Sequence, residues 1–312
     1  MKFWQSMFLC EGDQLFDAAQ IAEEVGFDGA AVSDHLVHFE HVETPYPYSA
    51  DGKPPSFTGE TVWPEAWSTC SALAAKTTRL QFVTNVYIVP LRHPVELAKA
   101  TSSAAYFSGG RICLGAGAGW MKEEFDMLGV DFHTRGKRFD ECIDVMRKLW
   151  SGNMVEHHGE FFDFAPMQMT PSPAQPVPIY IGGMSKAALR RAAQLGDGWM
   201  GPGQTVDAAL ETVTELNRLR EELDALAGGD ARSALPDCEL AGFLVEHLDE
   251  EPPDDLALGF GVGDAFELAE EALGSIDADH AHAEIALEEI HHGIAFTVPQ
   301  QSMIDEHAGE LV

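Results

Sequence analysis

GGRICLGAGAGWMKEEFDMLGV, residues 109–130, is the stretch that decides the fold. Its two leading glycines indicate a turn, and the apolar segment Arg111–Leu114 predicts a short strand buried on both faces. Glycines follow at every second position, at Gly115, Gly117 and Gly119. They predict a tight corner where the backbone approaches a flat ligand closely. An amphipathic helix is predicted to begin at Met121, so the stretch forms one strand–corner–helix unit.

This glycine pattern differs from a dinucleotide-binding fingerprint. That fingerprint places G-x-G-x-x-G at a helix start, with an acidic residue about 20 positions later. Here the third glycine comes one position early, and Trp120 stands where it is required. The meaning of G-x-G-x-G-W therefore depends on the units on either side.

Strand and helix signals alternate along the whole chain. The predicted strands are Lys2–Leu9, Ala30–Ser33, Arg79–Val86, Arg111–Leu114, Pro178–Ile181, Asp197–Met200, Glu239–Val245 and Ile294–Val298. The predicted helices are Gln14–Val25, one starting near Pro64, Pro94–Phe107, Met121–Met127, Arg135–Trp150, one capped by Ser185 and reaching Leu195, Asp207–Ala227, Phe266–Leu273 and Ala281–His291. Repeated right-handed strand–helix units predict a parallel sheet, and eight of them predict an α/β fold of the (β/α)8 TIM barrel type. A doubly wound open sheet is the alternative.

We expect a single domain over residues 1–312 with insertions after strands 2 and 4. The first insertion, residues 36–62, is a long polar loop rich in Pro and Tyr. The second, residues 151–176, contains VEHHGEFFDF, which predicts a hairpin with Gly159 at its turn, and then a Pro-rich connector. Residues 201–312 form a divergent acidic C-terminal third.

Charge is the most unusual global property of the chain. It carries 51 acidic and 19 basic residues, for a net charge of −32, and residues 201–312 hold 27 acidic and 3 basic residues. Such a surface repels nucleic acid and anionic membranes, so we expect neither as a partner. The acidic residues alternate with Leu, Ala and Ile at helical spacing, which favours solvated helix faces over disorder. Because salt screens this repulsion, we infer a halophilic source, an archaeon.

Membrane, disulfide and metal signals are absent from the sequence. No apolar run approaches the roughly 18 residues of a membrane span, and the N-terminal run lacks a cleavage pattern, so we expect a cytoplasmic protein. The five cysteines are odd in number and include no C-x-x-C pair, which argues against a disulfide framework or a thiolate metal site. Three histidines at three-residue spacing, His35, His38 and His41, fall in a predicted loop, so we assign no metal.

The functional residues of such a barrel lie at the carboxyl ends of its strands. That rule selects Asp34 and His35, Asn85 and Val86, Gly115 to Trp120, Gly182 to Ser185, and Trp199 to Gly201. These positions contain no nucleophile–base pair and no cluster of metal ligands. Their glycines, amides, aromatic rings and single histidine suit a flat bound cofactor.

Five strings carry a family resemblance: AEEVGFDGAAVSDHL, LAAKTTRLQFVTNVYIVPLRHPVELAKA, SGGRICLGAGAGWMKEEFDMLGVDFHTRGKRFDECIDVMRKLWSG, HHGEFFDF and PIYIGGMSKAALRRAAQLGDGWM. Over about residues 10–200 the chain resembles the bacterial luciferase-like flavin or deazaflavin oxidoreductases. The resemblance implies a (β/α)8 barrel with the isoalloxazine or deazaflavin ring at the strand ends.

The resemblance also implies roles for particular residues. His35 faces the reactive carbon of the cofactor and stabilises a developing oxyanion or exchanges a proton. Asp34 contacts the cofactor or orients the loop. A bulge with a non-proline cis peptide is implied at Asn85-Val86, behind the ring.

The cofactor phosphate is implied near Gly182, Gly183, Met184 and Ser185, where helix-start amides favour an anion. The remaining candidates for cofactor contact are Gly115, Gly117, Trp120, Trp199 and Gly201.

Two cofactors fit this fold, coenzyme F420 and FMN. The Ser-Asp-His-Leu string resembles the F420-dependent members more, so we expect an F420-dependent oxidoreductase that moves hydride to or from a small organic substrate. The alternatives are an FMN-dependent monooxygenase that uses reduced flavin and O2, and a non-catalytic flavin-binding barrel. Some deazaflavin dehydrogenases carry a glutamate at Trp120, and its absence favours an aromatic wall over a sugar-phosphate site.

Further expectations concern the loop, the cofactor tail and assembly. Residues 36–62, with Tyr46, Tyr48 and Phe57, are expected to cover the site and set its specificity. Cations for the anionic F420 tail are candidates among Arg92, Lys137, Arg138 and Lys186. Family members often dimerise through barrel helices, so we expect a homodimer.

Overall fold

The computed structural model describes residues 3–8, 10–54, 57–204, 206–226 and 240–244. Seven strands of the main sheet follow the order of the chain: β1 (Trp4–Ser6), β2 (Gly29–Val32), β3 (Gln81–Thr84), β5 (Ile112–Gly117), β8 (Ile179–Gly182), β9 (Gly198–Gln204) and β10 (Leu240–Leu244). A short strand, β4 (Tyr87–Ile88), also pairs with β5, and every pairing in this sheet is parallel. The predicted elements after residue 246 lie outside the described residues. The α/β class and the parallel sheet are confirmed.

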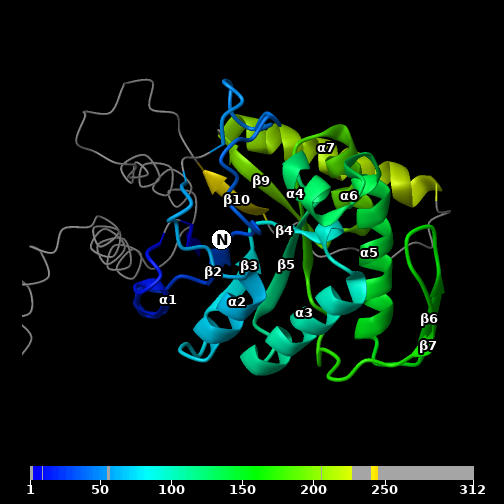
Figure 1. Cartoon of the computed structure of the whole chain (residues 1–312), viewed down its shortest axis with the longest axis horizontal. Helices are drawn as coiled ribbons and strands as arrows, with labels where there is room; N and C mark the ends of the chain where they lie inside the picture. Colours follow the sequence, from blue (N-terminus) through cyan, green and yellow to red (C-terminus); the bar gives the residue numbers. More distant parts are fainter. Residues whose placement is uncertain (1–2, 9, 55–56, 205, 227–239, 245–312) are drawn as a thin grey trace, which may run out of the picture.

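The helices lie along the outer side of the curved sheet (Figure 1). They are α1 (Leu15–Glu24), α2 (Ala66–Ala74), α3 (Pro94–Ser108), α5 (Arg135–Trp150), α6 (Lys186–Leu195) and α7 (Val206–Leu226). The short helix α4 (Lys122–Leu128) and the 3-10 turns η1 (Val89–Leu91) and η2 (Phe132–Thr134) lie in the connections that follow β4 and β5. The alternation of strands and helices that the sequence predicts is therefore present through β10. Because every pairing in this sheet is parallel, the carboxyl ends of its strands lie at one edge of the sheet.

Side chains alternate between the two faces of the sheet along each strand, and both faces are buried. One face, including Phe82 and Leu114, packs against the helices in the large core. The opposite face forms a smaller cluster of Ala31, Val83, Cys113, Tyr180 and Met200. Two-sided burial explains why the strands read as continuous apolar runs.

Two element boundaries differ from the prediction. Strand β5 continues through Gly117, so the predicted corner at Gly115 and Gly117 is wrong and the chain turns only after them. Helix α2 begins at Ala66, and Glu65 caps it by accepting hydrogen bonds from two backbone N–H groups. Pro64 precedes that cap instead of occupying the first helical turn, because the carboxylate supplies the acceptors that set the start.

The hairpin predicted from VEHHGEFFDF is confirmed. β6 (Val155–His158) pairs antiparallel with β7 (Asp163–Met167), and Gly159 N–H donates to Phe162 O at 2.9 Å across the turn. Glu141 of α5 fixes this turn by accepting from the backbone N–H of Phe162 and lying 3.1 Å from His157 Nε2. The hairpin extends beyond α5 in Figure 1.

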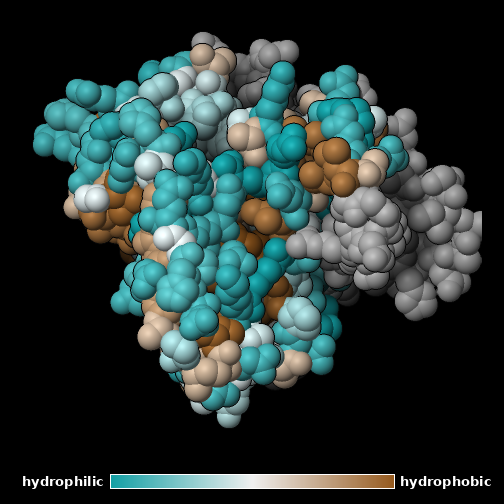
Figure 2. Space-filling model, turned by 90° about the vertical axis from the view of Figure 1, so that its right-hand side faces the viewer, coloured by the Kyte–Doolittle hydropathy of each residue, from teal (hydrophilic) through white to brown (hydrophobic). Residues whose placement is uncertain are grey.

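The face shown in Figure 2 is mostly hydrophilic, with apolar side chains in small separate patches. Within the described residues, no helix is both long enough and apolar enough to cross a membrane.

Candidate active site

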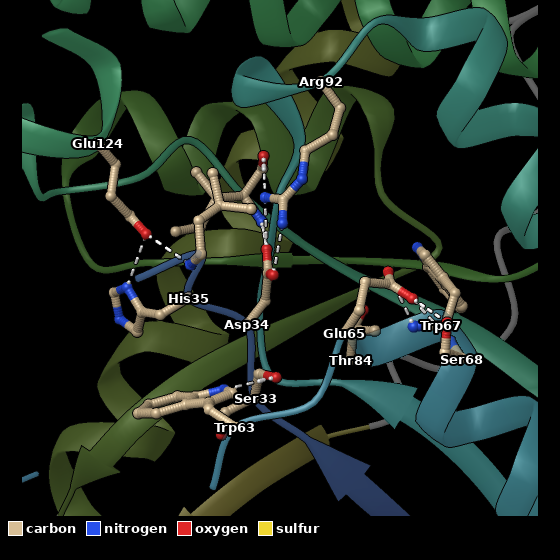
Figure 3. Close-up of polar contacts among 12 residues, drawn as sticks. Ser33, Asp34, His35, Trp63, Glu65, Trp67, Ser68, Thr84, Arg92 and Glu124 are labelled. Carbon is tan, nitrogen blue, oxygen red and sulfur yellow. Dashed lines mark hydrogen bonds and ion pairs between the residues drawn. The ribbon is translucent and has the colours of Figure 1, made fainter. Parts of the chain in front are cut away.

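A buried ion pair lies where β2 ends. Asp34 is 5% exposed, and its two carboxylate oxygens receive Arg92 Nη2 at 2.6 Å and Nη1 at 2.7 Å. The backbone N–H of Ile88 donates to the same carboxylate at 2.9 Å (Figure 3). Burial raises the pKa of Asp34, and the guanidinium and the Ile88 N–H oppose that shift. Because only donors face the carboxylate, the geometry is that of an ion pair, and it joins the end of β2 to Arg92 after η1 while the Ile88 N–H joins it to β4.

The ion pair shows how two of the candidate residues, Asp34 and Arg92, are oriented. Asp34 has both oxygens occupied beneath the surface, which fits orientation of the loop and leaves no carboxylate edge for a substrate. Arg92 also lies 4.2 Å from the centroid of the Tyr87 ring. Because its guanidinium is committed to Asp34, the structure argues against the expectation that Arg92 binds an anionic cofactor tail.

His35 lies beside a buried carboxylate that the sequence did not single out. Its Nδ1 is 3.2 Å from Oε1 of Glu124, and the same oxygen accepts from Leu36 N–H at 2.9 Å. Glu124 is 0% exposed in the first turn of α4, whereas the His35 side chain is 15% exposed. Figure 3 shows the glutamate approaching the imidazole from the side opposite Trp63.

Aromatic rings surround His35. The centroids of Trp63, Phe57 and Trp120 lie 5.1, 5.8 and 6.2 Å from that of the imidazole. Tyr46 in turn contacts Trp120, at 5.1 Å between centroids. The structure therefore brings residues of the 36–62 loop, Trp63 and Trp120 together around His35 in one aromatic enclosure.

The bulge at the end of β3 is present, and the peptide bond between Asn85 and Val86 is cis. A Cβ added to Gly117 would lie 2.4 Å from Val86 Cγ2, and one added to Gly182 would lie 2.7 Å from Val86 Cγ1. A Cβ at Gly115 would meet the carbonyl of Thr84 at 1.8 Å. Glycine at 115, 117 and 182 is thus required by the bulge and its neighbouring strand. The expected contact of these glycines with a cofactor stays a prediction.

The segment after β8 forms a turn into helix α6. Gly183 adopts φ of +113°, and Ser185 Oγ caps the helix by accepting from Ala188 N–H. The earlier N–H groups of α6 have no acceptor within the helix, which is the arrangement that favours an anion. Tyr48 of the loop reaches this turn, since its hydroxyl would lie 3.4 Å from a Cβ at Gly183.

Trp199 supports this turn from within the core. It is 1% exposed, and its indole N–H donates to Gly183 O at 2.9 Å. The ring occupies the space beside Gly201, where an added Cβ would approach it to 2.5 Å. The structure therefore places both residues beneath the turn, where they support its backbone, and their direct contact with a cofactor stays a prediction. Met184 is half-buried against the core.

Comparisons with known proteins agree on one family. The sequence model of the luciferase-like monooxygenase family matches residues 11–234 of the chain. An uncharacterized protein of Mycobacterium tuberculosis is 38% identical, over 78% of this chain and 84% of that protein. An F420-dependent glucose-6-phosphate dehydrogenase of Kineococcus radiotolerans is 33% identical, over 68% of this chain and 58% of that enzyme. Among solved structures, a monooxygenase of Streptomyces bottropensis shares the fold with a TM-score of 0.59 and 24% identity, over 73% of this chain and 67% of that one.

Proposed function

Because the chain belongs to the luciferase-like monooxygenase family, we propose that it is an F420-dependent oxidoreductase acting on a small organic substrate. The single observation that carries this proposal is His35, which is partly exposed at the end of β2 inside an aromatic enclosure. Imidazole titrates near neutrality and is suited to exchange a proton with a substrate hydroxyl or carbonyl. When bound, the deazaflavin would supply the hydride acceptor or donor that protein side chains lack.

The described residues fit such a cofactor in two respects. The turn at Gly183 leaves a small cradle bounded by Ala188 and Tyr48, at the N-terminus of α6. We assign the cofactor phosphate to this helix start, with Lys186 as the nearest cation of those expected from the sequence. The bulge at Asn85-Val86 lies at the neighbouring strand ends and would back the ring.

F420 is favoured over FMN by what the named relatives use. The dehydrogenase of Kineococcus radiotolerans depends on F420, and so does a hydroxymycolic acid dehydrogenase of Mycobacterium tuberculosis that is 28% identical over 77% of this chain. The alternative is an FMN-dependent monooxygenase, and the second alternative is a barrel that binds flavin without turnover. We therefore assign F420 as the first cofactor to test.

An uncharged, largely apolar substrate suits this site best. The rings of Phe57, Trp63 and Trp120 surround His35, and the nearby Arg92 is paired with Asp34. A sugar phosphate would meet aromatic surface there instead of cations. Secondary alcohols, ketones and enones are accordingly the first substrates to try.

The cofactor assignment is tested by anaerobic titration of the full chain at high salt with F420 and with FMN, followed by absorption. Saturable F420 binding, with a visible band that bleaches on reduction, supports hydride chemistry. Preferential FMN binding with oxygen uptake after reduction would move the protein to the monooxygenases. Binding without turnover on any of these substrates would support the non-catalytic barrel.

The role of His35 is tested by His35→Ala, with His41→Ala, an exposed histidine six residues further along the chain, as the control. We expect His35→Ala to lower kcat by about 10²- to 10⁴-fold, because proton transfer is lost, and to leave cofactor affinity nearly unchanged. Equal turnover in the two variants would refute the role.

We also propose that residues beyond 244 complete a (β/α)8 barrel in one domain, with 36–62 and 151–176 as the insertions after its second and fourth strands. The sequential order of the seven described parallel strands supports this. A homodimer is our proposal for the assembly. The adjacent rings of Tyr106 and Phe107, 68% and 70% exposed at the end of α3, support it. Sedimentation equilibrium at high salt measures the stoichiometry.

A further inference from the structure

Glu124 combines features that simple packing does not require. It is fully buried, and one oxygen, Oε1, receives both the Leu36 N–H and the approach of His35 Nδ1. The other oxygen, Oε2, has no hydrogen-bond partner within the described part of the chain. Burying a carboxylate is costly, so one that persists beside a partly exposed histidine points to a role in the site.

The surrounding charges leave Glu124 as the anion beside the imidazole. Asp34 and Arg92 lie near it, but they neutralise each other through two hydrogen bonds. Glu124 itself lies in the first turn of α4, where the helix dipole stabilises a negative charge. An ionised carboxylate only accepts hydrogen bonds, so Nδ1 of a neutral His35 must carry the proton in this contact.

We propose that Glu124 is the positioning residue of His35, holding the imidazole with its proton on Nδ1 and Nε2 free to accept one. The ring nitrogens lie on opposite edges, and Figure 3 shows Nε2 directed away from the glutamate. Nε2 makes no hydrogen bond with any described residue, and the rings of Phe57, Trp63 and Trp120 enclose the imidazole. The same carboxylate holds the backbone of Leu36, which ties the orientation of the imidazole to the start of the loop.

This inference rests on the proposed function for its chemical consequence. In alcohol oxidation the substrate O–H bond breaks, its proton bonds to Nε2, and its electrons form the carbonyl. A bound deazaflavin in its oxidised form would accept the C–H hydrogen together with its electron pair. The imidazolium that results is stabilised by the negative charge of Glu124 across the Nδ1–H bond.

The test uses nitrogen NMR of the full chain with 15N-labelled histidine, without cofactor, in alkaline buffer where an imidazole is neutral. The ring signals of His35 are assigned from the spectrum of His35→Gln. We expect the wild type to show a protonated Nδ1 and a bare Nε2. A bare Nδ1 with a protonated Nε2 in the wild type would overturn the proposal, and this readout needs neither cofactor nor turnover.

Variants separate the carboxylate from its surroundings. Glu124→Ala is expected to move His35 into a mixture of tautomers, whereas Glu123→Gln is the matched control. Glu123, one residue away, accepts from the N–H groups of Glu43 and Thr44 and does not contact the imidazole. Unchanged His35 signals in Glu124→Ala would also overturn the proposal. If Glu124→Ala does not fold, the wild-type spectrum and Glu124→Gln decide.

Glu124→Gln keeps an oxygen for both N–H donors, removes the negative charge and replaces the unpartnered oxygen by an NH2 group. With F420 and a working substrate, we expect kcat to fall about 10- to 100-fold while KM for the cofactor stays within about twofold. Wild-type kcat in Glu124→Gln would overturn the electrostatic part. If no cofactor binds at all, the proposed function fails while the tautomer result still stands.

Discussion

Removing either partner of the buried ion pair between Asp34 and Arg92 should strongly destabilise the fold, because it leaves the other charge buried without a counter-charge. The two side chains are 2% and 13% exposed, and the guanidinium meets the carboxylate with two hydrogen bonds. Asp34→Asn leaves a buried guanidinium without its counter-charge, and Arg92→Met leaves a buried carboxylate. Each change should cost about 3–5 kcal/mol of unfolding free energy.

The double variant Asp34→Asn/Arg92→Met should cost much less than the sum of the two single changes. Two unit charges about 4 Å apart interact by roughly 4 kcal/mol at an effective dielectric constant of about 20. We therefore expect a coupling energy of about 2–4 kcal/mol, since the neutral pair leaves no buried charge unpaired.

Urea unfolding of the four proteins, followed by circular dichroism at fixed high salt, measures this coupling. A matched control is the Arg218–Glu215 pair of α7, which has the same two-pronged geometry at 2.7 Å but lies on the surface. Its coupling should be much smaller and should weaken with salt, whereas that of the buried pair should persist. If the single effects of Asp34→Asn and Arg92→Met add to within about 0.5 kcal/mol, the ion pair does not hold the end of β2 to the segment after η1.

Three further predictions concern the bulge, acid stability and salt. Gly117→Ala should cost about 1–3 kcal/mol, because its Cβ would lie 2.4 Å from Val86, and Val86→Ala in the same chain should restore part of that loss; equal urea midpoints with and without Val86→Ala would contradict this. Burial raises the pKa of Glu23, but hydrogen bonds from the backbone N–H groups of residues 78–80 outweigh it and hold that pKa at about 2, so its stabilisation is present above the ordinary value of 4.5 and is lost as pH falls toward 2. Glu23→Gln should accordingly lower Tm at neutral pH and leave it unchanged near pH 2, and an equal decrease at both pH values would exclude this linkage. Because the net charge is −32, lowering NaCl from about 2 M to about 0.1 M should destabilise the protein, as followed by circular dichroism, and a constant Tm would remove the inference of a halophilic source.

Local signals in the sequence predicted most of the described fold. Apolar runs between helical stretches gave the order of strands through β10, and Ser185 was correctly identified as the cap of α6. The corner after β5 was misplaced, because glycines normally end a strand, whereas here they accommodate Val86 from the neighbouring bulge. That accommodation depends on a neighbouring strand and is invisible in the local pattern.

The candidate site was only partly predictable for the same reason. His35 could be placed by its position after a strand, but Glu124 lies 89 residues further along the chain and was read as an ordinary residue of an amphipathic helix. The available signal was the second of two glutamates in a first helical turn, directly before a buried Phe125. Arg92 pairs with Asp34, which precedes it by 58 residues. This pairing depends on both side chains being buried together, and the local sequence around a cation does not reveal that.

Two adjacent glutamates in the first turn of α4 determine which residues must be replaced together when the loop over this site is engineered. Glu124 holds the backbone at Leu36, and Glu123 holds it at Glu43 and Thr44. If the loop between β2 and α2 were replaced by that of a relative, its backbone N–H groups would not be positioned to donate to Glu123 and Glu124. To transfer substrate specificity from a relative, residues 36–62 and the first turn of α4 should therefore be exchanged together, although they are far apart in the sequence.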